Sequence, residues 1–149
     1  MLPLIGDELH TDLCQPVRPK LNRKLTRTGS NKILVIDDDQ ILCLGFAVRL
    51  KANYYDSCFA HDAESALNTA LTEMPNLIIL DIGLPGRDGY FVMQSLNAFP
   101  ELAHVPVIVL TGRDGSTHEE RCRDAGAKRF FQKPVDNLRL LTAIRQLVG

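Results

Sequence analysis

The sequence lacks any apolar run long enough to cross a membrane. A membrane-spanning helix needs about 20 consecutive apolar residues, and no such stretch occurs among the 149 residues. The first ten residues, MLPLIGDELH, contain two acids and no lysine or arginine, which is unlike a secretory signal peptide. We therefore expect a cytoplasmic protein with no membrane segment.

There is also no cysteine pairing motif and no dominant charge. The four cysteines and four histidines are scattered, without a C-x-x-C pair or zinc-ligand spacing. We expect ordinary thiols in a reducing compartment and assign no histidine a role. With 17 basic and 18 acidic residues the net charge is −1, which excludes the overall basic character of many nucleic-acid-binding proteins.

The charge is distributed unevenly along the chain. Residues 17–32 carry six basic side chains and no acidic one, and Pro16, Pro19 and a Gly-Ser-Asn run interrupt regular structure there. We interpret 1–31 as a basic, proline-containing N-terminal arm and 32–149 as the folded domain.

The arm allows more than one interpretation. Ile5, Leu9 and Leu13 recur every four residues, as on one face of a helix. A disordered tail, a docking helix and a contact with nucleic acid all remain open.

Within the domain, short apolar runs alternate with helical segments five times. The β-rich runs are 32–36, 55–60, 76–80, 105–110 and 128–132, and the helical runs are 38–52, 63–73, 90–99, 114–125 and 138–148. Asp39, Asp62 and Asp136 are predicted to cap helices. The alternation predicts an α/β fold, a doubly wound five-stranded parallel sheet with helices on both faces. Because 76–80 and 105–110 are apolar throughout, we place them in the sheet centre.

Polar groups follow four of the five predicted strands. Asp37, Asp38 and Asp39 follow the first, Asp81 the third, Thr111 and Gly112 the fourth, and Lys133 and Pro134 the fifth. The second strand ends at Ala60 and His61 and adds no obvious site group. Ligands of open α/β sheets bind outside the carboxyl ends of the strands, so we expect the polar groups to converge there.

Crowded carboxylates restrict what this site can be. Asp37, Asp38 and Asp81 would place three negative charges close together, which raises their pKa values or requires a counter-ion. Lys133 supplies one positive charge, and Mg²⁺ would balance the rest. The set predicts a site that receives a phosphoryl group on a carboxylate, with the Thr111 hydroxyl as a hydrogen-bond donor.

On these motifs, residues 32–149 resemble the receiver domain of bacterial two-component response regulators, of the chemotaxis-regulator-like kind. The matching segments are KILVIDDDQ, NLIILDIGLPGRDGY, VPVIVLTGRDG and AKRFFQKPV. Asp81 lies 43 residues after Asp38, Thr111 lies 30 after Asp81, and Lys133 lies 22 after Thr111; these intervals match the family. The resemblance implies a flavodoxin-like fold with strand order 2-1-3-4-5 and phosphorelay signal transduction.

The resemblance also implies residue roles at the site. Asp81 would accept the phosphoryl group from a histidine kinase or a histidine phosphotransfer protein. Lys133 would pair with Asp81 and then with the phosphoryl group. The implied Mg²⁺ ligands are Asp37, mostly through water, and Asp38, Asp81 and the carbonyl of Gly83.

Thr111 and Phe130 are the implied conformational switch. Thr111 would move inward to bond a phosphate oxygen, and Phe130, which has no hydroxyl, would follow it. The face made by the fourth helix, fifth strand and fifth helix would then meet an output partner or a second copy in a homodimer. Gly112, next to Thr111, would leave the pocket mouth open.

The implied protein is not an enzyme in the ordinary sense. It would catalyse only its own phosphorylation and dephosphorylation. Since the sequence stops after the fifth predicted helix, we expect no DNA-binding output domain in this chain.

Three other classes compete with this interpretation. A haloacid-dehalogenase-like phosphatase needs a second aspartate two residues after Asp81, where Gly83 stands. A flavodoxin-type flavin carrier needs a hydroxyl-rich phosphate loop after the first strand, where three aspartates stand. The remaining alternative is a non-phosphorylated pseudo-receiver that acts as a protein-binding module, although such domains usually lack Asp81, Thr111 or Lys133 equivalents.

The first predicted helix has two apolar stripes where an ordinary amphipathic helix has one. One stripe is Leu42, Phe46 and Leu50, which the family alignment places in the core; the other is Ile41, Leu44 and Val48. Either the second stripe widens the core contact, or it is an exposed docking surface for a phosphodonor or for the arm.

Overall fold

The computed structural model describes residues 30–84, 89–112 and 115–149. Within the chain, Asn31–Gly149 form one compact unit. The arm interpreted at 1–31 lies outside the described residues except for its last two. No helix in the described ranges is long and apolar enough to span a bilayer.

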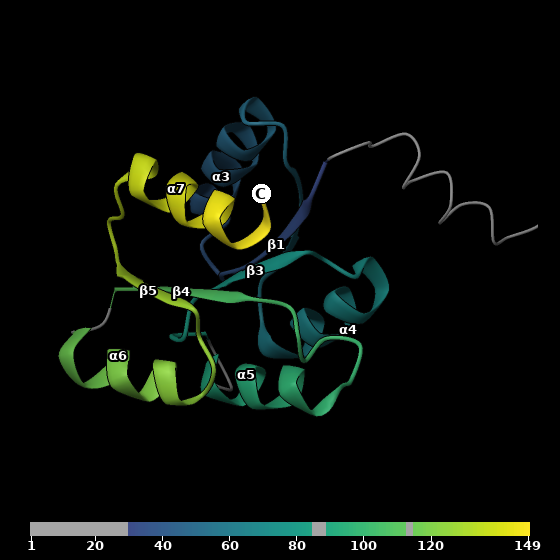
Figure 1. The fold of residues 1–149 in the computed structure, drawn as a ribbon, viewed down its shortest axis with the longest axis vertical. Helices are drawn as coiled ribbons and strands as arrows, with labels where there is room; N and C mark the ends of the chain where they lie inside the picture. The colour runs from purple at the N-terminus through teal and green to yellow at the C-terminus, as the bar shows by residue number, and fades with distance from the viewer. Residues whose placement is uncertain (1–29, 85–88, 113–114) are drawn as a thin grey trace, which may run out of the picture. The chain divides into compact units, whose positions relative to one another are not determined.

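Five strands and five helices alternate along this unit (Figure 1). They are β1 (Lys32–Ile36), α3 (Gln40–Ala52), β2 (Asp56–Ala60), α4 (Ala63–Glu73), β3 (Leu77–Leu80), α5 (Gly89–Ala98), β4 (Val107–Thr111), α6 (Gly115–Asp124), β5 (Arg129–Gln132) and α7 (Asn137–Val148). All four strand pairings are parallel and the order is β2-β1-β3-β4-β5. The predicted doubly wound sheet and its strand order are confirmed.

The predicted helix caps are also confirmed. The Asp39 carboxylate accepts hydrogen bonds from the first free N–H groups of α3, and Asp62 and Asp136 do the same for α4 and α7. Each cap satisfies backbone donors that have no partner within the helix. The Asp39 side chain therefore serves as the N-cap of α3.

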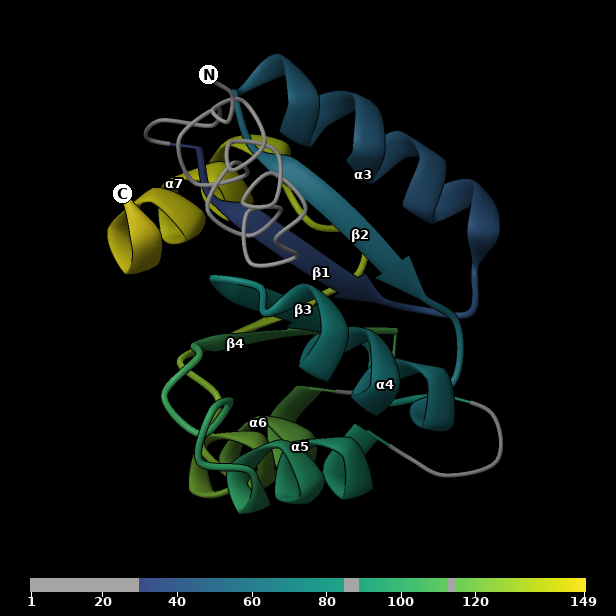
Figure 2. The same cartoon turned by 90° about the vertical axis from the view of Figure 1, so that its right-hand side faces the viewer.

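Two apolar cores lie on the two faces of the sheet. Strand residues alternate between them: Leu34 and Ile36 join the core under α4, α5 and α6, whereas Ile33 and Val35 join the core under α3 and α7. Figures 1 and 2 show these two helical layers. Since β3 and β4 are buried along their length, their continuous apolar sequences are explained by cover on both faces.

The second apolar stripe of α3 is exposed. Ile41, Leu44 and Val48 are 81%, 68% and 70% exposed. On the core side, Phe46 and Leu50 are buried as expected. Leu42 is only half-buried, so its expected place in the core is taken only in part, whereas its neighbour Cys43 is buried there.

The cysteines in the described residues are free thiols. Cys43 and Cys122 are buried and Cys58 is half-buried, while Cys14 lies outside the described residues. Burial raises the pKa of Cys43 and of Cys58 to about 11. Because the reactive form is the thiolate, these side chains serve packing.

Candidate functional site

Sheet register places the ends of β1 and β3 side by side. Ile36 pairs with Leu80 in the parallel ladder, and the N–H of Asp81 donates to the carbonyl of Ile36 at 2.9 Å. The next residue along each strand is therefore an aspartate. Asp37 and Asp81 leave the sheet at the same level because the strands are in register.

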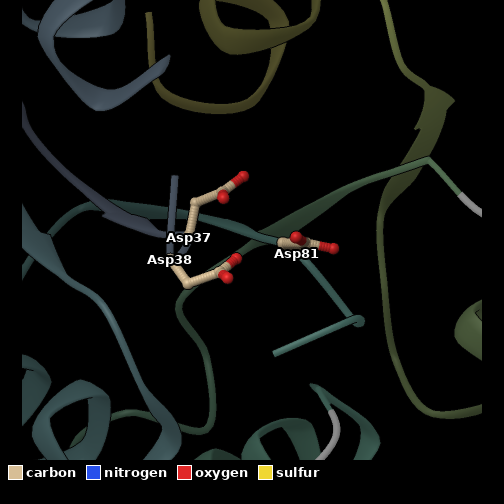
Figure 3. A group of neighbouring side chains, drawn as sticks. All are labelled: Asp37, Asp38 and Asp81. Atoms are coloured by element: carbon tan, nitrogen blue, oxygen red, sulfur yellow. The ribbon is translucent and has the colours of Figure 1, made fainter. Parts of the chain in front are cut away.

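Three carboxylates meet at this edge, as the sequence predicts (Figure 3). Asp37, Asp38 and Asp81 each offer an oxygen within 4.8 Å of the others. Asp37 and Asp81 are only 3% and 8% exposed, whereas Asp38 is exposed. Two acids therefore form the floor of the site and the third lies at its mouth.

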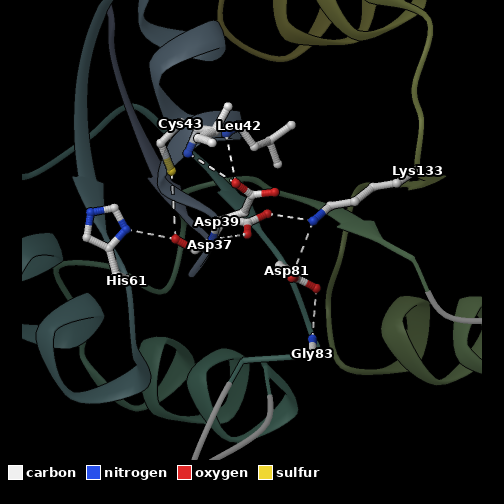
Figure 4. A network of polar contacts seen from close by, with 9 residues as sticks. Asp37, Asp39, Leu42, Cys43, His61, Asp81, Gly83 and Lys133 are labelled. Atoms are coloured by element: carbon white, nitrogen blue, oxygen red, sulfur yellow. Dashed lines mark hydrogen bonds and ion pairs between the residues drawn. The ribbon is translucent and has the colours of Figure 1, made fainter.

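Lys133 reaches the acids from the segment after β5 (Figure 4). Its ammonium is 2.7 Å from Asp37 Oδ2 and 3.4 Å from Asp81 Oδ2. Its backbone N–H donates to the carbonyl of Thr111 at 2.8 Å, which ties the end of β5 to the end of β4. The expected proximity to Asp81 is present, but Asp37 is the nearer acid.

Burial and charge act in opposite directions on this pair. Burial raises the pKa of the Asp37 carboxyl, and the hydrogen bond from Lys133 only partly offsets this effect. Burial by itself would lower the pKa of the Lys133 ammonium, but Asp37 and Asp81 together raise it. Lys133 is therefore held as a cation, and the floor of the site holds more negative charge than one lysine neutralises.

The segment after β3 fixes the Asp81 carboxylate. The N–H of Gly83 donates to Asp81 Oδ1 at 2.8 Å. Gly89 begins α5, and its N–H donates to the carbonyl of Ile82 at 3.0 Å. A Cβ at Gly89 would lie 2.4 Å from the Ile82 Cα, a separation that only glycine permits.

Asp37 is fixed on several sides. The N–H of Asp39 donates to Asp37 Oδ1 at 2.9 Å, and the carbonyl of Asp37 accepts from His61 Nδ1 at 2.9 Å (Figure 4). The thiol of Cys43 lies 3.7 Å from the same carbonyl. His61 was assigned no role from sequence, although its place directly after β2 put it at the same sheet edge.

Thr111 and Phe130 lie on neighbouring strands. Thr111 ends β4 and is 1% exposed. Phe130 pairs with Val109 across the ladder and is half-buried against the core under α4, α5 and α6. At Gly112 an added Cβ would meet nothing within 4 Å, so the position next to Thr111 is open.

The donor set suits a hard divalent cation. Its three side chains are all carboxylates, and Mg²⁺ is typically held by one or two carboxylates together with water and phosphate oxygens. No nitrogen or sulfur ligand belongs to this group, which is unlike zinc sites. The residues therefore fit the predicted Mg²⁺.

An open parallel sheet with an acidic site at its carboxyl edge defines the class as flavodoxin-like α/β. Residues 33–145 match the family model of the response regulator receiver domain. The chain therefore belongs to this family and is a receiver domain of two-component systems.

Individual relatives agree with this assignment. The response regulator PleD of Caulobacter vibrioides is 35% identical over 118 residues, which are 79% of this chain and 26% of PleD. The polar-differentiation response regulator DivK of Brucella anthropi is 29% identical over 117 residues, which are 78% of this chain and 95% of DivK. The chain thus spans about a quarter of PleD but nearly all of DivK.

A solved structure shares the fold. The receiver domain of the sensor histidine kinase PA1611 from Pseudomonas aeruginosa aligns with a TM-score of 0.74 at 24% identity. The alignment covers 81% of this chain and 99% of that one, and that domain has a magnesium ion coordinated in its active-site cleft.

Proposed function

We propose that Asp81 is the phosphoryl-accepting residue of this receiver domain. The observation that carries the proposal is the position of Lys133, whose ammonium reaches Asp37 and Asp81, the two buried acids of the group. Asp81 is the acid that follows the central strand, and its carboxylate is oriented by the N–H of Gly83.

The proposed reaction is a phosphoryl transfer from a phosphohistidine. An Asp81 carboxylate oxygen attacks phosphorus, the P–N bond breaks, and the imidazole leaves with the electron pair of that bond. The product is an acyl phosphate. Lys133 neutralises charge on the transferred group, and the Thr111 hydroxyl donates to one of its oxygens. Water later hydrolyses the acyl phosphate, so the domain catalyses only its own phosphorylation and dephosphorylation.

Mg²⁺ is the proposed cofactor. Asp38 and Asp81 would hold it directly, Asp37 mostly through water, and the carbonyl of Gly83 would complete the protein ligands. When bound, Mg²⁺ supplies positive charge to phosphoryl oxygens. The support lies in the all-carboxylate donor set and in its excess negative charge over Lys133.

Two surfaces are proposed to meet partners. The exposed stripe of α3 (Ile41, Leu44 and Val48) would contact the helices of a histidine kinase or histidine phosphotransfer protein. Thr111 and Phe130 would transmit phosphorylation to the face of α6, β5 and α7, where an output partner or a second copy would dock.

Phosphorylation of the purified protein with acetyl phosphate and Mg²⁺ tests the proposal. We expect intact-mass spectrometry to show the gain of one phosphoryl group, which Asp81→Asn abolishes. Asp124→Asn, which changes an acid on α6, is the matched control and should be phosphorylated normally. No mass gain in the wild type would favour the alternative, a pseudo-receiver that only binds proteins.

A further inference from the structure

The imidazole of His61 is hydrogen-bonded to the main chain of the acidic site but has no part in the function proposed above. His61 directly follows β2, and its Nδ1 lies 2.9 Å from the carbonyl oxygen of Asp37 (Figure 4). A carbonyl oxygen can only accept a hydrogen bond, so Nδ1 carries the hydrogen and donates it. A half-buried side chain at the end of β2 is therefore bound to the backbone of one of the three acids.

Backbone contacts alone already hold the end of β2 beside the end of β1. The ladder pairs Ile36 with Ala60, and the N–H of Asp37 donates to the carbonyl of Ala60 at 3.0 Å. The imidazole therefore adds something other than the pairing of the two strands. It supplies a donor to the Asp37 carbonyl, to which no backbone N–H of the described residues donates.

This carbonyl belongs to the peptide group that joins Asp37 to Asp38. A peptide group is planar, so a fixed carbonyl oxygen also fixes the direction of the Asp38 N–H and the position of the Asp38 Cα. The other donor to the same oxygen is the thiol of Cys43 at 3.7 Å, and a thiol is a weak donor. The imidazole of His61 is therefore the stronger restraint on this peptide group.

Asp38 depends on its backbone more than the other two acids do. The carboxylates of Asp37 and Asp81 are held by Lys133, and Asp81 also accepts from the N–H of Gly83. Within the described ranges, the exposed Asp38 carboxylate takes part in no hydrogen bond or ion pair. Because its side chain has only two torsions with few preferred values, the orientation of the preceding peptide group limits where its oxygens can lie.

We propose that His61 is a positioning residue for the metal site. Its hydrogen bond to the Asp37 carbonyl orients the Asp37–Asp38 peptide group, and this orientation directs the Asp38 carboxylate toward the proposed Mg²⁺. His61 acts through the backbone and is not itself a metal ligand. Groups that orient metal ligands typically change metal affinity by about 10–100-fold. This role rests on the proposed Mg²⁺ site.

Two variants separate the hydrogen bond from the bulk of the side chain. Leucine in His61→Leu fills space without a donor, whereas the Nδ2 of asparagine in His61→Asn can donate to the carbonyl in place of the imidazole. Tyr55→Phe is the matched control, because Tyr55 lies just before β2 and its hydroxyl donates to the carbonyl of Gly149 at 3.2 Å. The control thus removes one side-chain hydrogen bond to a backbone carbonyl at the opposite end of the same strand.

Titration calorimetry of the full chain with Mg²⁺ measures the effect on the site. We expect His61→Leu to weaken Mg²⁺ binding about tenfold, His61→Asn to recover most of this loss, and Tyr55→Phe to bind like the wild type. Without metal, the amide NMR resonance of Asp38 should shift in His61→Leu and return toward its wild-type position in His61→Asn. This second measurement reports on the peptide group itself and does not depend on metal or on phosphorylation.

Phosphorylation with acetyl phosphate distinguishes lost affinity from a damaged acceptor. At limiting Mg²⁺ the rate for His61→Leu should fall about tenfold with the metal affinity, and saturating Mg²⁺ should restore it, because Asp81 is unchanged. A rate that stays low at saturating Mg²⁺ would contradict a role in metal affinity.

Four further results would overturn the role of His61. They are wild-type Mg²⁺ affinity in His61→Leu, equal weakening by Tyr55→Phe, no recovery in His61→Asn, and an Asp38 amide resonance that does not respond to His61→Leu. Each would leave the proposed function standing if the wild type binds Mg²⁺ and is phosphorylated on Asp81. A wild type that binds Mg²⁺ without being phosphorylated would contradict the proposed function, while weaker binding by His61→Leu would still support the role of His61. No Mg²⁺ binding by the wild type would overturn both.

Discussion

The ammonium of Lys133 is 2.7 Å from a carboxylate oxygen of Asp37 and 3.4 Å from one of Asp81. The cation of the site is therefore held most closely by the acid that is not the proposed acceptor. Transfer of a phosphoryl group to Asp81 would replace the single charge of its carboxylate by about −1.5 to −2 on the phosphoryl oxygens. We expect this charge to draw Lys133 away from Asp37.

Removing the lysine charge should destabilise the unphosphorylated domain. In Lys133→Met, Asp37 and Asp81 face each other without a cation, and we expect the free energy of unfolding to fall by about 1–3 kcal/mol. Urea titration measures this effect. Adding Asp37→Asn should recover part of the loss, and a double variant no more stable than Lys133→Met would contradict the ion-pair explanation.

The same contact sets an alkaline limit on stability. Because the pKa of Lys133 is raised above its ordinary 10.5, its contribution is fully present below that value and is lost as pH rises through the folded pKa. Urea titrations between pH 8 and pH 10 should show a constant difference in stability between the wild type and Lys133→Met, and titrations above pH 10.5 should show wild-type stability falling toward that of Lys133→Met. Parallel curves for the two proteins above pH 10.5 would be evidence against this linkage.

Asp38 should matter for metal and not for folding. Its side chain is exposed at the mouth of the acidic group, so Asp38→Ala should keep or slightly raise apo stability, by up to about 0.5 kcal/mol. Mg²⁺ affinity should fall about tenfold or more, and phosphorylation with it. Titration calorimetry measures the Mg²⁺ affinity, and intact-mass spectrometry measures the extent of phosphorylation.

Asp39→Ala is the matched control, since it removes the neighbouring acid. Loss of the α3 cap should cost about 1 kcal/mol of stability while Mg²⁺ binding persists. A marked drop in the melting temperature of Asp38→Ala would contradict the view that its charge is only repulsive in the apo domain.

The Thr111 hydroxyl should couple the site to the β5 face. Beryllofluoride with Mg²⁺ should shift amide resonances between residues 111 and 131 in the wild type, and Thr111→Ala should reduce those shifts without preventing phosphorylation. Thr142→Ala, which removes an exposed hydroxyl from α7, should respond like the wild type. If beryllofluoride with Mg²⁺ left the amide NMR spectrum of the wild type unchanged, this result would contradict the switch hypothesis.

The exposed stripe of α3 predicts that a substitution there slows phosphoryl transfer from a protein donor but not from a small-molecule donor. Leu44 is 68% exposed, so Leu44→Glu should change stability by no more than about 0.5 kcal/mol. Transfer from a cognate phosphohistidine donor should slow by about tenfold, and transfer from acetyl phosphate should not.

A buried residue of the same helix provides the comparison. Leu50 is 1% exposed, and Leu50→Ala should cost about 2–5 kcal/mol of stability without distinguishing the two donors. Equal slowing of both reactions by Leu44→Glu would show that the stripe supports the fold.

Periodicity and capping were sufficient to predict a five-stranded parallel sheet, the caps at Asp39, Asp62 and Asp136, and the convergence of the three carboxylates, whereas the strand order was implied by the family resemblance. These features depend on local sequence and on the geometry of a parallel sheet. The two stripes of α3 left open whether Leu44 is buried or exposed, and the structure shows that it is exposed. The functional roles of the site residues remain predictions.

Contacts between distant segments could not be predicted in this way. The hydroxyl of Tyr90 and Nδ1 of His118 are 2.9 Å apart, although they belong to helices 28 residues apart in sequence. The bond from His61 to the Asp37 carbonyl likewise depends on how β2 ends. Such contacts arise from the packing of whole elements, which no local pattern encodes.

Gly89 limits how this sequence can diverge. Any side chain there would collide with the backbone of Ile82, one residue beyond Asp81, so a substitution must displace either α5 or the segment that orients the proposed acceptor. Random mutagenesis selected only for folding should tolerate changes at 89 when α5 shifts outward. Selection for phosphorylation should return glycine alone. The requirement for glycine at position 89 would then reflect function, although glycine has no side chain that could take part in the reaction.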